Sequence, residues 1–257
     1  MSLLFSFNLY HKWYFVVLFI FIIPLFYLLM FAIYCIILFF ISLLFDKNKK
    51  INKPNRFYYF LVKETCQQLL ILSNTKVHII GKEKINSDKN YLVVSNHISN
   101  FDPIVAIVHL GLKTLMGVSK KENFSIPICG PFIHKAGFIS LDRNNFHSSI
   151  ESITQATNYL KDKSTSVYIC PEGTRSKDLN LLPFHPGSFK VALNAESDIV
   201  VLYIKNTNLI AKNFPFKRTH VYLKVVNVIN YQDIKGKTSL EISKEVYEMI
   251  RNEKENM

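Results

Sequence analysis

Charged residues, and acidic residues above all, are scarce in this sequence. Only 19% of its 257 residues are charged while 49% are hydrophobic, and this composition excludes an intrinsically disordered chain. The 19 Asp and Glu residues stand against 31 Lys and Arg, which gives a formal net charge of +12. A basic chain attracts polyanions such as nucleic acid, an anionic bilayer or phosphorylated substrates. Because the sequence has no nucleic-acid reader motif, we expect no nucleic-acid partner.

Cysteine is rare as well, and its spacing carries no pattern. The chain has 4 cysteines without a CxxC pair or a Cys/His cluster: Cys35, Cys66, Cys129 and Cys170. Neither a zinc site nor a disulfide framework is indicated, so we expect no bound metal. Internal repeats and low-complexity tracts are also absent. A chain of this length then allows one ordinary domain and an appendage.

Charge is missing altogether from Trp13 to Phe45. A helix over this run would be about 50 Å long at about 1.5 Å per residue, against roughly 30 Å of bilayer hydrocarbon. Pro24 lies inside the run and favours a kink or a break. Two arrangements therefore stay open, one strongly tilted span or two shorter helices that dip into the membrane as a hairpin. A cleaved signal peptide would have a much shorter apolar stretch.

Basic residues follow the apolar run. The cluster consists of Lys47, Lys49, Lys50, Lys53 and Arg56. By the positive-inside rule, it predicts that the rest of the chain lies on the cytoplasmic side of a membrane. We therefore divide the chain into an N-terminal tail (1–12), a membrane-embedded helical segment (13–45), a basic linker (46–55) and one folded domain (56–257).

The folded domain is expected to alternate strands with helices after an amphipathic helix at Arg56–Leu72. Strands are predicted at Val77–Ile80, Tyr91–Ser95, Thr114–Val118, Phe138–Leu141, Ser166–Cys170, Ile199–Ile204 and His220–Val228. Helical stretches are predicted at Pro103–Leu110, Ser148–Lys161, Phe189–Ala195 and Ser239–Asn252. This alternation predicts an α/β fold, a single domain with a largely parallel sheet flanked by helices.

A histidine and a carboxylate stand five residues apart in the turn after the strand Tyr91–Ser95. The turn is Asn96-His-Ile-Ser-Asn-Phe-Asp-Pro103. Asp102 before Pro103 is typical of a helix N-cap, which would fold Asp102 back toward His97. An aspartate that accepts a hydrogen bond from one imidazole nitrogen leaves the other nitrogen free to take a proton from a hydroxyl. The alternative is that Asp102 only caps the helix and His97 only fills the turn.

Two further segments supply arginines at the ends of predicted strands. The segment Gly137–Arg143 delivers Arg143 where open α/β sheets place ligands, and a guanidinium there suits a phosphate monoester. The loop Pro171-Glu-Gly-Thr-Arg-Ser176 can cradle an anion through backbone N–H groups and Arg175. We interpret Glu172 as a partner of a substrate hydroxyl or a brace for the arginines. For the first segment, the alternative is a surface ion pair between Arg143 and Asp142. For the loop 171–176, the alternative is a plain turn.

Together and in this order, the three segments resemble the glycerolipid acyltransferase family typified by 1-acyl-sn-glycerol-3-phosphate acyltransferases. The family's motifs Asn-His-x4-Asp, Gly-x-Ile-x-x-x-Arg and Pro-Glu-Gly-Thr-Arg-Ser are matched by Asn96, His97 and Asp102, by Gly137, Ile139 and Arg143, and by Pro171–Ser176. A fourth block departs from the pattern, because Val201 stands where the family usually has a proline. This departure leaves the choice of acyl donor open.

The resemblance implies a membrane-bound enzyme of phospholipid biosynthesis without a resident cofactor. It would move a fatty acyl group from acyl-CoA or acyl carrier protein to the sn-2 hydroxyl of lysophosphatidic acid, giving phosphatidic acid. His97 would be the general base and Asp102 its orienting partner, without a covalent acyl-enzyme. The implied substrate-binding residues are Arg143, Glu172, Gly173, Thr174 and Arg175. Alternatives are another acceptor (glycerol 3-phosphate or another lysophospholipid), transacylation, or a catalytically silent lipid-binding protein of the same fold.

A basic stretch late in the domain surrounds Phe214-Pro-Phe216. No acidic residue occurs between Asp198 and Asp233. The basic residues of this stretch are Lys205, Lys212, Lys217, Arg218 and Lys224. We hypothesise that it seats the domain on anionic membrane lipid, with a solvated basic loop as the alternative.

Overall fold

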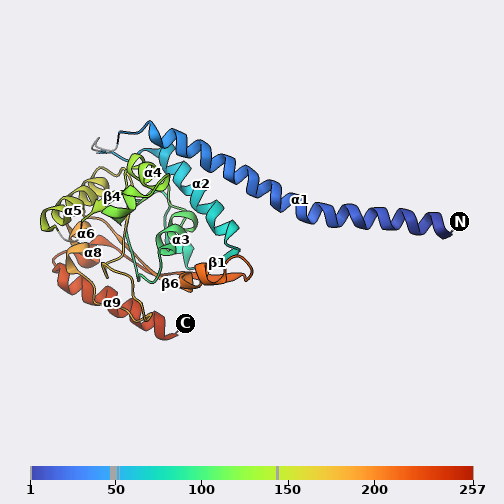
Figure 1. Ribbon diagram of the computed structural model, residues 1–257. Coiled ribbons are helices and arrows are strands. Elements are labelled where there is room, and N and C mark those ends of the chain that lie inside the picture. The colour runs from blue at the N-terminus through green and yellow to red at the C-terminus, as the bar shows by residue number, and fades with distance from the viewer. Residues whose placement is uncertain (1, 47–50, 52, 143–144, 257) are drawn as a thin grey trace. The chain divides into compact units, whose positions relative to one another are not determined.

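The computed structural model describes residues 2–46, 51, 53–142 and 145–256. The chain divides into two compact units, Met1–Lys47 and Asn48–Met257 (Figure 1). The first unit is built on a single helix and the second on a sheet covered by helices. Each unit is described in turn.

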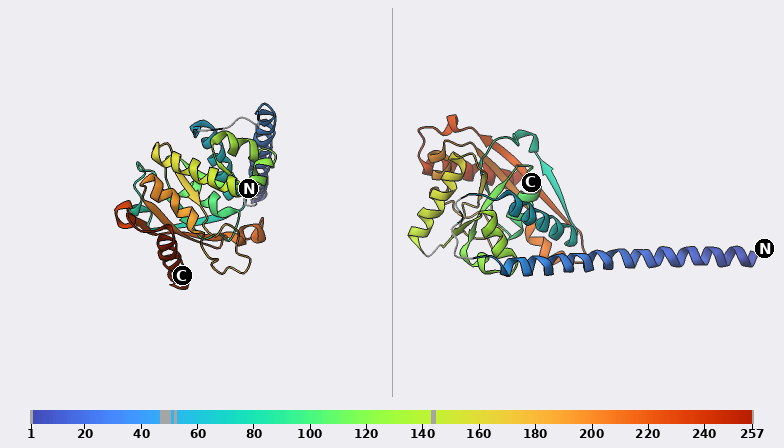
Figure 2. Two further views of the ribbon diagram at one scale, coloured as in Figure 1. Left: turned by 90° about the vertical axis from the view of Figure 1, so that its left-hand side faces the viewer. Right: turned by 90° about the horizontal axis from the view of Figure 1, so that it is seen from above.

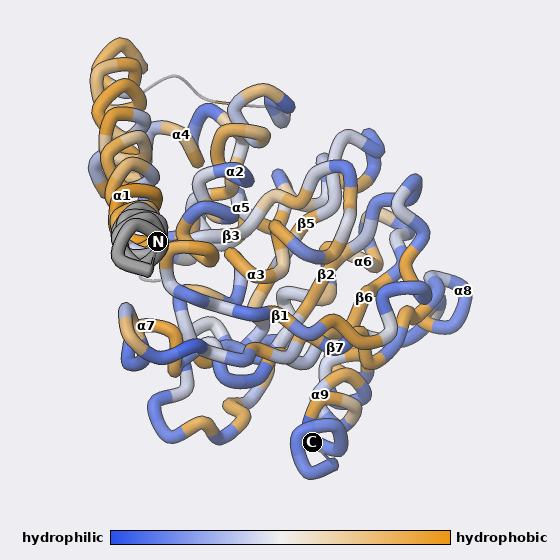
Figure 3. The backbone as a smooth tube through the Cα atoms, turned by 90° about the vertical axis from the view of Figure 1, so that its right-hand side faces the viewer, coloured by the Kyte–Doolittle hydropathy of each residue, from blue (hydrophilic) through white to orange (hydrophobic). Residues whose placement is uncertain are grey.

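Helix α1 (Ser2–Leu43) is continuous and contains Pro24 in its interior. One helix, rather than a hairpin of two, therefore occupies the apolar run. It already begins inside the predicted tail 1–12, because neither proline nor glycine interrupts residues 2–23. Residues Val16–Leu43 are long and apolar enough to cross a membrane. Figure 3 shows the hydrophobic character of α1 along its coloured length.

The second unit is built on a seven-stranded sheet with the order β1-β7-β6-β2-β5-β3-β4. Its strands are β1 (Thr75–Ile80), β2 (Leu92–Ser95), β3 (Leu115–Lys120), β4 (Ile139–Leu141), β5 (Ser166–Ile169), β6 (Ile199–Lys205) and β7 (Thr219–Ile229). Neighbouring strands are parallel throughout, except for the antiparallel pair β6 and β7. The predicted fold, an α/β domain with a largely parallel sheet, is confirmed.

Helices cover both faces of the sheet. They are α2 (Arg56–Leu72), α3 (Phe101–His109), α4 (Cys129–Ala136), α5 (Phe146–Lys161), α6 (Lys190–Ala195), α7 (Ile210–Asn213), α8 (Tyr231–Ile234) and α9 (Ser239–Asn256). The chain crosses the sheet in one direction from β2 to β4 and in the other from β4 to β6. Because such crossovers are right-handed, α3 and α4 lie on one face and α5 and α6 on the other (Figure 1 and Figure 2).

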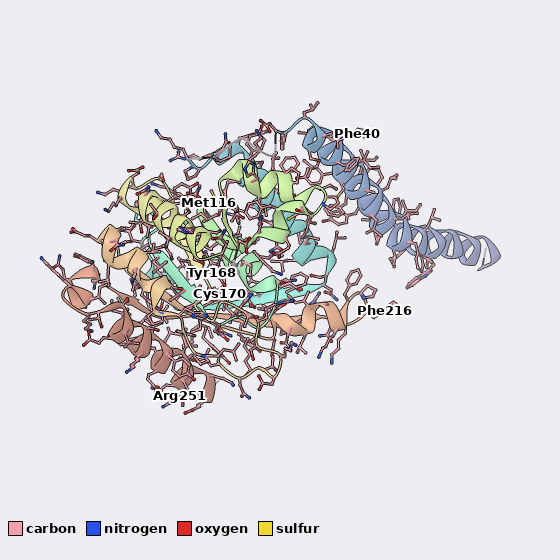
Figure 4. All side chains as sticks on the ribbon, turned by 60° about the vertical axis from the view of Figure 1, so that its left-hand side comes forward. Phe40, Met116, Tyr168, Cys170, Phe216 and Arg251 are labelled. Atoms are coloured by element: carbon pink, nitrogen blue, oxygen red, sulfur yellow. The ribbon has the colours of Figure 1, made fainter. Side chains whose placement is uncertain are left out.

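The core is densest around the central strands. All residues of β2 and β5 are buried, as parallel strands covered on both faces require. Met116 of β3 and Tyr168 of β5 are among the fully buried side chains (Figure 4). In β6, Val201 pairs with Val94 of β2, and the register with β7 shifts next to it, between Val201 and Leu202. Strand β6 is thus irregular next to Val201.

Candidate active site

The site lies where three adjacent strands end. The strands β6, β2 and β5 are neighbours in the sheet and run parallel, so their carboxyl ends meet at one edge. The segments that follow them carry His97 after β2, Glu172 after β5 and Thr207 after β6. The topology therefore brings together residues up to 110 positions apart in the chain.

The imidazole of His97 is held by Asp102. His97 Nδ1 lies 2.9 Å from Asp102 Oδ2, and because a carboxylate only accepts, Nδ1 carries the proton. The same oxygen accepts hydrogen bonds from the backbone N–H groups of Ile98 and Ser99, each at 2.8 Å. Asp102 lies within the first turn of α3 and not at its N-cap, which is Asn100, so the predicted capping role is wrong. The predicted return of Asp102 toward His97 is confirmed.

Asp102 is completely buried, and its second oxygen has a partner that the sequence did not reveal. Thr207, in the 3₁₀ helix η4 (Thr207–Leu209), donates its hydroxyl to Asp102 Oδ1 and is itself fully buried. With the His97 ring and the N–H groups of Ile98 and Ser99, the Thr207 hydroxyl makes four donors around one carboxylate. These hydrogen bonds compensate the cost of burying its charge. Thr207 stands 105 residues after Asp102, and a lone threonine carries no signal that could have marked it.

Glu172 joins the histidine turn to the loop after β5. Its Oε1 accepts from the backbone N–H of His97 at 2.6 Å, and its Oε2 accepts from the backbone N–H of Leu182 at 3.0 Å. The side chain is only 3% exposed, and this burial raises the pKa of Glu172 against the lowering effect of the two donors. Ser176 N–H also donates to the His97 carbonyl at 2.9 Å. Both oxygens of Glu172 therefore hold backbone groups, a role that the sequence interpretation did not anticipate.

Asn96 fastens the histidine turn to β6. Its side-chain amide nitrogen donates to the Ile204 carbonyl at 2.9 Å, and its oxygen accepts from the Ile204 N–H at 2.8 Å. This two-point contact is buried, with Asn96 4% exposed. The asparagine of the Asn-His-x4-Asp motif thus positions the neighbouring histidine through the sheet.

We expect Asn96→Ala to destabilise the domain by about 3 kcal/mol, because it leaves a buried N–H and a buried carbonyl of Ile204 unpaired. The melting temperature of the full-length protein in detergent measures this loss. Asn158→Ala, at an exposed position of α5, is the matched control and should change the melting temperature little. Equal melting temperatures for the two variants would show that the contact with Ile204 does not stabilise the sheet.

A thiol lies beside the imidazole. Cys170, directly after β5, interacts electrostatically with the His97 ring, and its sulfur lies 3.5 Å from the buried Tyr168 hydroxyl (Figure 4). Burial lowers the pKa of His97, but Cys170 and Asp102 more than offset this effect and raise the pKa to about 10. This electrostatic coupling to its two neighbours sets the pKa of His97.

A cationic pocket of about 450 Å³ opens next to the histidine turn. It is lined by Ile98, Thr174, Arg175, Ser176, Lys177, Leu179, Asn208 and Lys212. No acidic residue of the described chain lines it, so the pocket suits an anion. Of the predicted binding residues, Thr174 and Arg175 are here, whereas Arg143 lies outside the described residues. Lys177, Asn208 and Lys212 are lining residues that were not predicted.

Gly173 sets the path of the loop above this pocket. Its φ of +67° lies in the left-handed region, and a Cβ there would come within 2.9 Å of the His185 ring. The backbone of His185 is held in place because its amide N–H donates to the Pro171 carbonyl at 2.8 Å. Only glycine therefore fits this turn without strain, which explains its place in the predicted loop.

An oriented imidazole beside a cationic pocket, at the carboxyl ends of a parallel sheet, defines a class of α/β proteins equipped for proton transfer next to an anionic ligand. Within that class, the chain belongs to the Acyltransferase family. The sequence model of this family matches residues 76–205, which include the histidine turn and the Glu172 loop. The match stops before Thr207 and Lys212.

Three curated relatives that this chain resembles are named 1-acyl-sn-glycerol-3-phosphate acyltransferase. The relative from Limnanthes douglasii is 31% identical over 159 residues, which cover 61% of this chain and 56% of the relative. The relative from Escherichia coli is 30% identical over 167 residues, which cover 65% of this chain and 66% of the relative. The relative from Cocos nucifera is 34% identical over 145 residues, which cover 56% of this chain and 46% of the relative. The matches thus span between about half and two thirds of these relatives.

The fold is shared with a solved structure. It is the crystal structure of the 1-acyl-sn-glycerophosphate (LPA) acyltransferase PlsC from Thermotoga maritima, with a TM-score of 0.64. The likeness covers 87% of this chain and 88% of that one at 24% sequence identity. At this identity it shows the fold, and the chemistry is argued from the site itself.

Proposed function

We propose that this protein transfers a fatty acyl group to the sn-2 hydroxyl of 1-acyl-sn-glycerol 3-phosphate and so makes phosphatidic acid. The observation that carries the proposal is the Asp102-held imidazole of His97 next to a pocket lined by three cations and no described acid. The acyl donor is a thioester of CoA or of acyl carrier protein. The proposal needs no resident cofactor, because a thioester is already an activated acyl group.

His97 is the proposed general base. In its neutral form, Nε2 takes the proton of the acceptor hydroxyl while the hydroxyl oxygen attacks the thioester carbonyl. The tetrahedral intermediate then collapses, the carbon–sulfur bond breaks, and the imidazolium returns its proton to the leaving thiolate. Asp102 holds the ring and stabilises the imidazolium through its negative charge. The acyl group passes directly to the acceptor, without a covalent acyl-enzyme.

The cationic pocket is the proposed site of the acceptor's phosphate. A phosphate monoester carries up to two negative charges and no cation, which matches Arg175, Lys177 and Lys212 better than a zwitterionic headgroup does. Thr174 adds a hydroxyl, and Gly173 shapes the loop. Arg143 is proposed as a further phosphate ligand. Glu172 acts as a positioning residue, since both of its oxygens hold backbone N–H groups.

Helix α1 is proposed to anchor the enzyme in the membrane that holds its substrate and product. An anchored site can act on a lipid whose acyl chain stays in the bilayer, which avoids extracting it at about 0.8 kcal/mol per CH₂. The basic residues after α1 favour a cytoplasmic catalytic domain. Membrane lipid is therefore both the environment and the source of the acceptor.

Membranes containing the full-length protein provide the test. They are offered lysophosphatidic acid, glycerol 3-phosphate or lysophosphatidylcholine, each with labelled acyl-CoA or labelled acyl carrier protein. The proposal expects phosphatidic acid from lysophosphatidic acid. A preference for another acceptor would overturn the acceptor assignment, and the absence of transfer by folded protein would favour a silent lipid-binding protein.

Arg175→Ala should raise KM for lysophosphatidic acid by about tenfold to a hundredfold, since a charged hydrogen-bond partner of the phosphate is lost. We expect kcat to change less than KM, because the phosphate does not react. Initial rates over a range of acceptor concentrations separate the two constants. Arg251→Ala, on the exposed side of α9, removes an equal charge away from the pocket and should leave both constants unchanged.

The rate should depend on pH through His97, which acts as a base only when neutral. Its raised pKa places the rise of kcat/KM with pH above neutrality. Cys170→Ala removes a neighbour that favours the imidazolium, so the pKa of His97 falls and the rise moves to lower pH. Profiles of kcat/KM against pH measure this shift, with Cys129→Ala as the control. Superimposable profiles for natural protein and Cys170→Ala would contradict the coupling.

A further inference from the structure

The segment after β6 has two faces with different chemistry. On its inner face, Thr207 is fully buried against Asp102, and Ile210 is also fully buried. Asn208 and Lys212 line the cationic pocket. On its outer face, Phe214 is 54% exposed and Phe216 is 96% exposed, the highest value among the large hydrophobic residues of the described chain.

The exposed rings stand among cations. Lys212, Lys217 and Arg218 are all exposed, and the described segment has no acidic residue between them. Figure 4 shows Phe216 projecting away from the domain, and Figure 3 shows hydrophobic and hydrophilic residues side by side around α7. Exposed aromatic rings flanked by Lys and Arg are the combination that enters the interface of an anionic bilayer, with the rings in the acyl boundary and the cations at the headgroups.

We propose that residues 210–218 form a second membrane contact, in which Phe214 and Phe216 insert into an anionic bilayer surface and bring the mouth of the cationic pocket to the level of the lipid headgroups. This contact is distinct from α1. It places the pocket where a lysophospholipid presents its phosphate, because Lys212 of the pocket lies only two residues before Phe214. The inference rests on the proposed function only in taking the acceptor to be a membrane lipid.

Fluorescence quenching tests the contact without any need for turnover. The chain has a single tryptophan, Trp13, so Phe216→Trp in a Trp13→Phe background places one reporter in the segment. The full-length variant is reconstituted into vesicles of phosphatidylcholine and phosphatidylglycerol, with or without bromine on the acyl chains. We expect strong quenching by the brominated lipid, and weaker quenching when phosphatidylglycerol is left out.

Leu240→Trp in the same background is the matched control. Leu240 is 51% exposed at the start of α9, which lies apart from α7 in Figure 3. Its indole should be quenched little. Absence of quenching for the Phe216→Trp indole, or equal quenching of both indoles, would overturn the proposal.

Kinetics separate this contact from the proposed function. The double variant Phe214→Ser, Phe216→Ser should raise KM several-fold for long-chain lysophosphatidic acid in vesicles, and leave KM unchanged for a short-chain, water-soluble analogue. Leu240→Ser should change neither. An equal effect on both acceptors would mean that the rings support the fold or the pocket, which contradicts the membrane contact. If no acyl transfer is found at all, the proposed function fails while the quenching result still decides the contact.

Discussion

Replacing His97 by alanine is expected to lower kcat by about a thousandfold, within the range that general bases contribute to proton transfer. The loss follows from the geometry, since Asp102 holds Nδ1 at 2.9 Å and Nε2 is the ring nitrogen left for the acceptor hydroxyl. Acyl transfer to lysophosphatidic acid by membranes with equal amounts of natural and variant protein measures it.

The control for this prediction is His78→Ala. His78 lies on the edge strand β1 and stacks on His220 and Tyr222, away from the strand ends that form the site. Its loss should leave turnover unchanged. Near-natural turnover by a folded His97→Ala protein would rule out His97 as the base. A His97→Ala protein that binds the lipid but does not turn it over would exclude a purely structural role.

The second large effect is expected from Asp102→Asn, which should lower kcat by about 10²- to 10⁴-fold with little loss of stability. The asparagine oxygen can accept from the N–H groups of Ile98 and Ser99, and its amide nitrogen can donate to the Thr207 hydroxyl. The hydrogen bonds are kept while the negative charge that stabilises the imidazolium is lost. Measuring both kcat and the melting temperature of this variant separates the effect of the lost charge from an effect on the fold.

Asp102→Ala provides the contrast. It leaves four donors around a fully buried position without an acceptor, so it should lower the melting temperature as well as kcat. Asp88→Asn, at an exposed carboxylate paired with Lys113, should affect neither quantity. If Asp102→Asn retained natural turnover, the charge of Asp102 would have no part in the reaction.

Much of the fold could be predicted because its strands are short apolar runs between turn residues. Each of the strands β1 to β7 lies within a few residues of a predicted run. The helix α4 was missed because Cys129-Gly-Pro131 opens it, and these residues have low helix propensity. The order of the strands was also out of reach, since it depends on pairing between segments far apart in sequence.

The site could be predicted where its parts are close in sequence. The contact between His97 and Asp102 was predicted from an N-cap at Asp102, and the structure has the contact although Asn100 is the N-cap. The predicted Gly137 is explained by the structure in a different way, because it ends α4 in a left-handed conformation with a φ of +99°. Lys212 stood out in the sequence only as part of the basic stretch that lacks acidic residues. Its place in the lining of the pocket follows from the fold alone.

The position of β6 between β7 and β2 also bears on how the chain is made. Ribosomal synthesis releases the histidine turn long before η4, so a nascent chain holds Asp102 and His97 while the partners supplied by Ile204 and Thr207 have not yet emerged. Until β6 adds to β2, the carboxylate has one oxygen open to water and the turn lacks its contact with Ile204. The growing chain therefore completes its site only after more than 200 residues have left the ribosome, when α1 has long been available for membrane insertion.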